Sequence, residues 1–151
     1  MKNKYRKETQ NLTSFLLEEI CLKYNKSLTP TRLLIYRIIE KNNRPISAYE
    51  IQEEVRNSDL NFNISTVYRV LDFFIDIGLI HKLATINKFT ICAKPKEKHI
   101  HMINLCTRCE NVVESCNKVM GLDFKKSMSN FDMLINQKHT IELSVLCSGC
   151  K

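Results

Sequence analysis

The sequence has few of the residues from which nucleotide-binding loops are built, and it has no long apolar segment. Only 3 of its 151 residues are glycine, so glycine-rich loops that cradle phosphates have no candidate, which argues against a nucleotide-dependent enzyme. No apolar run approaches the roughly 20 residues that a membrane-spanning helix requires. Residues 1–10 are charged and are not followed by an apolar core with a small-residue cleavage site. We therefore expect a soluble, cytoplasmic protein that is not an enzyme and has neither a membrane partner nor a small-molecule substrate beyond a metal ion.

The chain has a surplus of positive charge. It contains 23 Lys and Arg residues against 16 Asp and Glu residues, which gives a formal net charge of +7. The surplus is shared by both halves of the chain, so neither half is a dedicated basic tail. Such a charge favours a polyanionic partner such as nucleic acid, although many basic proteins bind none.

Two Cys-x-x-Cys pairs give the strongest indication of chemistry. Cys106 and Cys109 form the first pair, Cys147 and Cys150 form the second, and residues 110–146 separate them. Four thiolates in two such turns match the tetrahedral preference of a structural Zn²⁺. The separation is longer than in a compact zinc ribbon, so the intervening chain must fold and return before the site closes. A redox-active pair and unrelated cysteines are the alternatives, and a disulfide would need an oxidising compartment.

Four helices and a β-hairpin are predicted in the N-terminal part of the chain. Thr29 is expected to cap the second helix, with Pro30 in its first turn. Ser47 and Glu50 form a capping box for the third helix, and Ser65 is expected to cap the fourth. The predicted helices cover residues 10–24, 30–42, 48–56 and 66–77, ending before Gly78, and the hairpin strands cover 79–83 and 89–92. This is the order of a winged helix-turn-helix, so residues 1–93 are expected to form a DNA-binding domain.

The rest of the chain is expected to form a small dimerisation domain held by zinc. Residues 94–98 are a charged linker or hinge, and the domain covers residues 99–151. Strands are predicted at 100–105 and 112–115, a helix at 116–128, and further strand within 131–146, including the alternating stretch 139–145. A domain of this size buries too little apolar surface to be stable through its core alone, and a bound structural metal would add stability. The predicted fold class is therefore α/β (α+β).

The fourth predicted helix carries the candidate DNA-reading residues. In a helix-turn-helix, the N-terminal residues of the second helix meet base edges and phosphates in the major groove. The DNA-binding candidates are Ser65, Thr66, Tyr68 and Arg69 in this helix, with Arg32, Lys82 and Lys88 for backbone contacts. Asp72 and Asp76 lie further along and would be repelled by phosphate, so only the first two turns can face DNA. For any single one of these side chains, an ordinary solvated surface is the alternative.

Several segments of the sequence resemble the Fur family of metal-responsive repressors. They are Leu28-Thr29-Pro30-Thr31-Arg32, Ile46-Ser47-Ala48-Tyr49-Glu50-Ile51, Ile64-Ser65-Thr66-Val67-Tyr68-Arg69-Val70-Leu71, Gly78-Leu79-Ile80 and both Cys-x-x-Cys pairs. The resemblance implies a homodimer in which winged helices read a palindromic operator in double-stranded DNA, while C-terminal domains with a four-cysteine zinc dimerise. It also implies a second, regulatory divalent metal. The expected function is therefore metal-dependent transcriptional repression of metal uptake genes.

Within the family, the sequence is most similar to the regulators of zinc uptake. The resemblance implies that a regulatory zinc is held by His81, Cys92, His99 and Glu114, which match the ligand positions of that subgroup, with His101 as an alternative to His99. A thiolate with imidazoles suits Zn²⁺ better than Fe²⁺ or Mn²⁺, which favour oxygen and nitrogen ligands. An iron, manganese or peroxide sensor is the alternative within the family. A zinc-bound thiol redox switch is a more distant alternative.

Strand pairing in the wing bears on two of these ligands. A wing turn centred between Ile86 and Asn87 would place His81 directly opposite Cys92. Cβ atoms of directly opposed residues lie about 4.5 to 5.5 Å apart, so one ion could bridge the two side chains.

Strand pairing also bears on the choice between His99 and His101. Pairing around Thr107 and Arg108 would place His101 opposite Glu114, whereas the family offset favours His99.

The first cysteine turn departs from the family pattern. Glu110 follows Cys109 where the family often has glycine, so the turn is expected to be distorted or to close through Asn111. Cys21 and Cys116 are interpreted as core or capping residues, and His139 is left out of the metal site.

Overall fold

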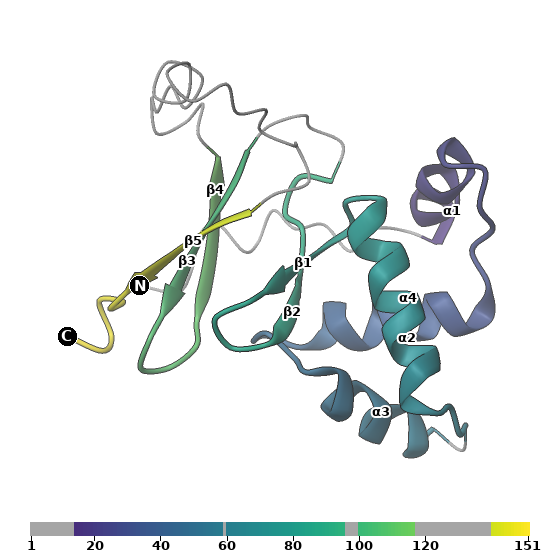
Figure 1. Cartoon of the computed structure of the whole chain (residues 1–151), viewed down its shortest axis with the longest axis horizontal. Coiled ribbons are helices and arrows are strands. Elements are labelled where there is room, and N and C mark those ends of the chain that lie inside the picture. Colours follow the sequence, from purple (N-terminus) through teal and green to yellow (C-terminus); the bar gives the residue numbers. More distant parts are fainter. Residues whose placement is uncertain (1–13, 59, 96–99, 117–139) are drawn as a thin grey trace. The chain divides into compact units, whose positions relative to one another are not determined.

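The structure, a computed structural model, describes residues 14–58, 60–95, 100–116 and 140–151 (Figure 1). The chain divides into two compact units, Met1–Pro95 and Lys96–Lys151. The first unit is mainly helical and also contains a two-stranded sheet, and the second, as far as it is described, is a three-stranded sheet. In the described ranges, no helix combines the length and the apolar character needed to cross a lipid bilayer.

The first unit has the element order of a winged helix-turn-helix (Figure 1). Its described helices are α1 (Ser14–Lys23), α2 (Pro30–Lys41), α3 (Ala48–Arg56) and α4 (Ile64–Asp76), and they are followed by strands β1 (Ile80–Leu83) and β2 (Lys88–Ile91). Helix α4 packs against α2 and α3, β2 packs against α2, and β1 against α4. The order predicted from the sequence is confirmed.

The starts of α2 and α3 are set by local capping, as predicted. The Thr29 hydroxyl accepts a hydrogen bond from the Arg32 N–H at 3.3 Å, and Pro30 is the first helical residue. At α3 the Glu50 N–H donates to the Ser47 hydroxyl at 3.2 Å, and the Ser47 N–H donates to the Glu50 carboxylate at 2.7 Å. Both halves of the capping box are therefore formed.

Helix α4 begins earlier than predicted, because Asn63 and not Ser65 is its N-cap. The Asn63 side-chain oxygen accepts from the Thr66 N–H at 2.9 Å and from the Ser65 hydroxyl at 2.7 Å. Asparagine and serine cap helices about equally well, so the sequence alone did not separate the two. At the other end, Gly78 has a φ of 73°, the left-handed conformation that suits the predicted stop.

The apolar stripes of the helices form the core of the first unit. Ile35 and Tyr36 of α2 and Leu71 and Phe74 of α4 are fully buried. The rings of Tyr36 and Phe74 meet edge to face, with centroids 5.6 Å apart and planes at 76°, an arrangement that adds about 0.5 to 1.5 kcal/mol to the gain from burial. Cys21 is buried in the same core, as predicted.

The wing has a different register from the one considered for it. His81 pairs with Thr90, and Leu83 pairs with Lys88, so the turn covers residues 84–87 and is centred one residue earlier than assumed. His81 and Cys92 are therefore not directly opposed. Asn87 has a φ of 50° at the last position of the turn, where asparagine tolerates the left-handed region better than most residues.

The second unit contains a three-stranded sheet in the order β4-β3-β5. Its strands are β3 (His101–Cys106), β4 (Val112–Cys116) and β5 (Thr140–Val145). The central strand β3 is antiparallel to β4 and parallel to β5. Met102, Ile103 and Leu105 of β3 are buried.

The predicted strands of the second unit are confirmed where they are described. Cys116, the expected first residue of a helix, is instead the last residue of β4. The rest of that helix, the start of the strand region, and His139 lie outside the described residues.

Candidate metal centres and nucleic-acid interface

Two turns of the second unit bring the four predicted structural zinc ligands together. The Sγ atoms of Cys106, Cys109, Cys147 and Cys150 all lie within 4.8 Å of one another. The Sγ atoms of Cys109 and Cys147 are 3.7 Å apart, much farther than the roughly 2.05 Å of a disulfide bond. Sulfurs placed tetrahedrally around Zn²⁺, each at about 2.3 Å, would be about 3.8 Å apart. The donor set and its spacing therefore fit a structural Zn²⁺.

The parallel strand pair explains how the distant cysteine pairs meet. Strand β3 ends at Cys106 and strand β5 ends at Val145, and these two residues are paired in the sheet. The Thr107 N–H continues the ladder by donating to the Val145 carbonyl at 2.9 Å. Both cysteine turns consequently leave the sheet at the same end. The chain between the pairs thus returns alongside β3, as the sequence required.

Proton affinities differ within the four-cysteine cluster. Backbone N–H donors, first that of Cys147 and then those of Cys109 and Arg108, lower the pKa of Cys106 to about 6. Hydrogen bonding to the sulfurs of Cys147 and Cys109 holds the proton of Cys150 and raises its pKa. One thiolate therefore forms readily while another thiol resists ionisation. A bound cation is what would allow all four to act as thiolates together.

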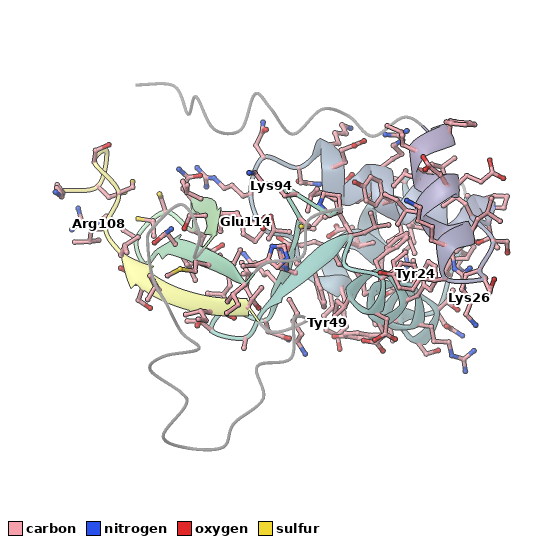
Figure 2. All side chains as sticks on the ribbon, turned by 90° about the horizontal axis from the view of Figure 1, so that it is seen from above. Tyr24, Lys26, Tyr49, Lys94, Arg108 and Glu114 are labelled. Atoms are coloured by element: carbon pink, nitrogen blue, oxygen red, sulfur yellow. The ribbon has the colours of Figure 1, made fainter. Side chains whose placement is uncertain are left out.

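Two residues beside the cysteines form hydrogen bonds to the backbone of the cysteine turns. Glu110 has a φ of 56°, so the distortion expected in place of glycine falls on Glu110 itself, and its N–H donates to the Cys106 carbonyl at 3.0 Å. Arg108 Nη1 donates to the Cys150 carbonyl at 2.7 Å, and Figure 2 shows Arg108 beside the C-terminal segment. This contact of Arg108 was not predicted from the sequence. Its position inside the first cysteine turn was the available signal.

The wing of the first unit holds a histidine and a cysteine close together. His81 of β1 is 6% exposed, and Cys92, just after β2, is 2% exposed. The Cys92 N–H donates to the Leu79 carbonyl at 2.9 Å, so His81 and Cys92 are diagonal neighbours on the hairpin. A ring nitrogen of His81 and Sγ of Cys92 lie within 4.8 Å of each other. Although the register differs from the assumed one, this distance allows a single ion to contact both side chains.

The second unit holds a matching pair of candidate ligands. His101 Nδ1 contacts Glu114 Oε1 at 2.5 Å, and both side chains are largely buried. The two residues are also diagonal neighbours, because Glu114 pairs with Ile103 and His101 with Cys116. The predicted direct pairing of His101 with Glu114 is therefore wrong, because His101 pairs with the residue two positions further along. The two side chains are nevertheless in contact. His99 lies outside the described residues.

The N-terminal turn of α4 presents the predicted DNA-reading residues. Ser65 and Arg69 are exposed, and Thr66 and Tyr68 are half-buried. The hydroxyls of Ser65 and Thr66 both donate to the Asn63 side-chain oxygen. The start of a helix carries a partial positive charge and backbone N–H groups that favour phosphate, so the arrangement is compatible with the predicted role.

The predicted backbone-contacting residues have different surroundings. Lys82 is exposed and Lys88 is half-buried in the wing. The Arg32 guanidinium stacks on the Phe73 ring, 3.8 Å from its centroid, and donates to the Ser27 carbonyl. Arg32 thus has a structural role in joining α2 to α4, and its contact with DNA stays a prediction.

The two units together define a class of protein that joins a winged helix-turn-helix to a small sheet carrying a four-cysteine zinc site. The model of the ferric uptake regulator family matches residues 23–144, and the chain belongs to this family. The predicted resemblance is thereby confirmed.

The chain is similar in sequence and in structure to zinc uptake regulators. The chain is 30% identical over 134 residues to the zinc uptake regulation protein of Escherichia coli strain K12, which covers 88% of this chain and 78% of that protein. It is similar to a solved structure of a zinc uptake regulator complexed with zinc and DNA, with a TM-score of 0.80, 27% identity, and coverage of 99% and 96% of the two chains. It is also similar to the crystal structure of holo XcZur, with a TM-score of 0.70, 31% identity, and coverage of 89% and 93%.

Proposed function

We propose that the protein is a zinc-responsive, DNA-binding transcriptional repressor that controls metal uptake genes. The observation that carries the proposal is the buried pair of His81 and Cys92 in the wing directly after α4, because an imidazole and a thiol at ligand distance form half of a zinc site. The similarity to zinc uptake regulators supports the same function. Such a regulator binds chromosomal DNA, so we place it in the cytoplasm and assign it no catalytic residues.

The regulatory metal site in this proposal takes two ligands from each unit. His81 and Cys92 come from the first unit, and Glu114 with a histidine comes from the second. For that histidine we propose His101, because its ring contacts Glu114, with His99 as the alternative. When bound, a divalent cation would favour the thiolate of Cys92.

The DNA-binding part of the proposal assigns residues 1–93 to operator recognition. Ser65, Thr66, Tyr68 and Arg69 would enter the major groove from the start of α4, while Lys82 and Lys88 of the wing would contact phosphates. The overall positive charge of the chain supports this assignment. Residues 94–98 would then be the hinge through which metal binding orders the reading head.

The dimerisation part of the proposal assigns residues 99–151 to the interface between two copies. Leu143, Val145 and Leu146 are 36 to 49% exposed at the end of the chain. Within the described sheet, β5 lies at an edge, where a second copy can add its own strand and cover these apolar side chains. A two-fold dimer would match a palindromic operator.

Operator binding at buffered free zinc tests the proposed function. The ligand is a duplex selected from random sequences by the zinc-loaded full chain, and its affinity is measured by fluorescence anisotropy. We expect zinc at the second site to tighten binding about 5- to 150-fold, the range of typical coupling energies. Metal analysis should give two zinc ions per wild-type chain and one in His81→Ala and Cys92→Ala, which should bind DNA only in the weak mode.

Matched variants make this test specific. Thr85→Ala changes an exposed residue of the wing turn and should keep both zinc ions and the zinc response. His101→Ala and His99→Ala, compared directly, identify the histidine ligand. Equal operator affinity with the second site full and empty would refute the proposed regulation.

An iron sensor is the second candidate function. It is favoured by the His101–Glu114 contact, since a nitrogen and oxygen ligand pair suits Fe²⁺. This alternative predicts that Cys92→Ala keeps a metal-dependent operator response to Fe²⁺. The zinc proposal predicts that the response is lost.

A further inference from the structure

The first turn of α4 is organised around one side-chain oxygen. Asn63 Oδ1 accepts hydrogen bonds from the Ser65 hydroxyl at 2.7 Å, from the Thr66 hydroxyl at 2.9 Å and from the Thr66 N–H at 2.9 Å. A backbone N–H only donates, so the Asn63 atom that faces it is the amide oxygen and not the amide nitrogen. The two hydroxyls therefore share a partner whose chemical identity is fixed by the backbone.

This arrangement determines the direction of both hydroxyl hydrogen bonds. An amide oxygen only accepts, whereas a hydroxyl has one proton and two acceptor lone pairs. Ser65 and Thr66 must therefore each direct their single proton toward Asn63. Ser65 is exposed and Thr66 is half-buried, so both oxygens can still meet a partner from outside the protein. To that partner each hydroxyl offers its lone pairs alone.

Double-stranded DNA has few groups that can donate a hydrogen bond to such an oxygen. Phosphate oxygens are acceptors, so a hydroxyl whose proton is already committed forms no hydrogen bond with them. In the major groove, guanine presents N7 and O6 and thymine presents O4, and all of these are acceptors. The donors on the base edges are the N6 amino group of adenine and the N4 amino group of cytosine. The two hydroxyls are therefore complementary to these amino groups and not to the phosphate backbone.

We propose that Ser65 and Thr66 determine operator specificity by accepting hydrogen bonds from the amino groups of adenine or cytosine in the major groove. The inference rests on the proposed function, in which the start of α4 enters this groove. Asn63 is then a positioning residue, because its oxygen holds both hydroxyl protons and leaves the lone pairs for the bases. Each of the two positions that these hydroxyls contact should consequently carry an adenine or a cytosine on the contacted strand.

Removal of single amino groups from the operator tests the inference. The probe is the duplex selected by the zinc-loaded full chain, in which purine replaces one adenine, or pyrimidin-2-one replaces one cytosine, at a time. At the two contacted positions, the affinity of the wild type should fall about 3- to 10-fold, the value of one hydrogen bond. Ser65→Ala should bind the altered and unaltered duplexes equally at one of these positions, and Thr66→Val should do so at the other, as measured in double-mutant cycles. Thr66→Ser, which regains a hydroxyl, should restore the difference.

Two further variants show that the hydroxyl direction, and not the fold alone, is responsible. Asn63→Ala releases both protons, so the hydroxyls can also donate, and the preference against thymine and guanine at the two positions should relax. Asn63→Asp keeps an acceptor oxygen, so it should weaken binding to all duplexes alike through its charge and retain the base preferences. Ser58→Ala removes a serine hydroxyl that donates to the Glu54 carbonyl in α3, and it should leave every base preference unchanged.

Arg69→Ala separates failure of this inference from failure of the proposed function. If Arg69→Ala loses discrimination between the selected duplex and an unrelated one, while removal of amino groups affects the wild type, Ser65→Ala and Thr66→Val equally, α4 reads DNA but its hydroxyls do not read amino groups. If Arg69→Ala also discriminates like the wild type, the proposed reading by α4 fails with it. An equal loss of affinity for every duplex in Ser65→Ala would assign that hydroxyl to phosphate and overturn the inference as well.

Discussion

At the scale of single residues, the backbone of Glu110 departs from what its side chain prefers. Its φ of 56° lies in the left-handed region, which costs a residue with a Cβ about 1 to 2 kcal/mol. Glu110→Gly should therefore raise the free energy of unfolding of the zinc-loaded protein by about 1 kcal/mol, partly offset by the larger entropy of glycine in the unfolded chain. Urea unfolding measures the change. Glu110→Ala keeps the Cβ and serves as the control, and an equal gain in both variants would contradict the strain argument.

The capping box at α3 gives a residue-scale prediction with a pH dependence. Hydrogen bonds from the Ser47 hydroxyl and then from the Ser47 N–H lower the pKa of Glu50 below its ordinary value of 4.5. This stabilisation is complete above pH 4.5 and is lost as the pH falls through the folded-state pKa, because the folded state then must take up a proton it binds weakly. Ser47→Ala should cost about 1 kcal/mol of unfolding free energy at neutral pH, and the difference from wild type should shrink on acidification.

Ser58→Ala is the matched control for that experiment. The Ser58 hydroxyl donates to the Glu54 carbonyl at 3.2 Å near the other end of the same helix, with no carboxylate involved. Its effect should be independent of pH. Because Glu50 is exposed, added salt should also weaken the Ser47 effect. A Ser47→Ala deficit that persists unchanged in acid would exclude a charged capping box.

At the scale of elements, helix α4 has Asn63 as its N-cap, whereas the sequence predicted Ser65. The Asn63 side-chain oxygen accepts three hydrogen bonds, from the Thr66 N–H and from the hydroxyls of Ser65 and Thr66. Asn63→Ala should therefore lower the free energy of unfolding by about 1 kcal/mol, whereas Ser65→Ala should cost much less. Thermal unfolding of both variants measures the difference. A larger loss in Ser65→Ala would restore the assignment made from the sequence.

The elements also separate what the sequence could predict from what it could not. Caps such as Thr29 and Ser47 were predictable because their hydrogen bonds span only three residues along the chain. Strand register was less predictable, because it depends on which residue accepts a left-handed turn conformation. Asn87 takes that conformation in the wing and Glu110 takes it in the cysteine turn. In both hairpins, the residue that pairs with the histidine is two positions away from the residue assumed.

The same contrast applies to the candidate metal ligands. The four-cysteine cluster was predictable because two Cys-x-x-Cys turns fix the sulfurs locally, and only their meeting needed the parallel pairing of β3 with β5. The orphaned hydroxyl of Tyr36 was not predictable, because its position fits an ordinary apolar stripe of α2. Only the folded structure shows that this oxygen has no hydrogen-bond partner among the described residues.

At the scale of the whole molecule, the two units should differ in their need for metal. The core cluster of the first unit is made entirely of residues between Leu17 and Phe89, so this unit should fold without zinc. The described sheet of the second unit is small, and removal of its structural zinc should unfold it, because metal-binding energy is folding energy in such domains. Cys147→Ser should therefore lose the unfolding transition of the second unit and keep the helical transition of the first, as followed by circular dichroism. Ser148→Ala, between two cysteine ligands, should keep both transitions.

The proposed dimer depends on the exposed edge of β5. Val145 is 37% exposed on a strand that is at the edge of the described sheet, and a glutamate placed there would have to be buried, unpaired, between two copies. Val145→Glu should convert the dimer to monomers in sedimentation experiments. It should also weaken operator binding strongly, since one winged helix can then contact only one half-site. Ser144→Glu adds the same charge at the neighbouring position, whose side chain points to the opposite face of the strand, and should remain dimeric. If Val145→Glu stays dimeric and binds the operator like wild type, the interface must lie on a surface other than β5.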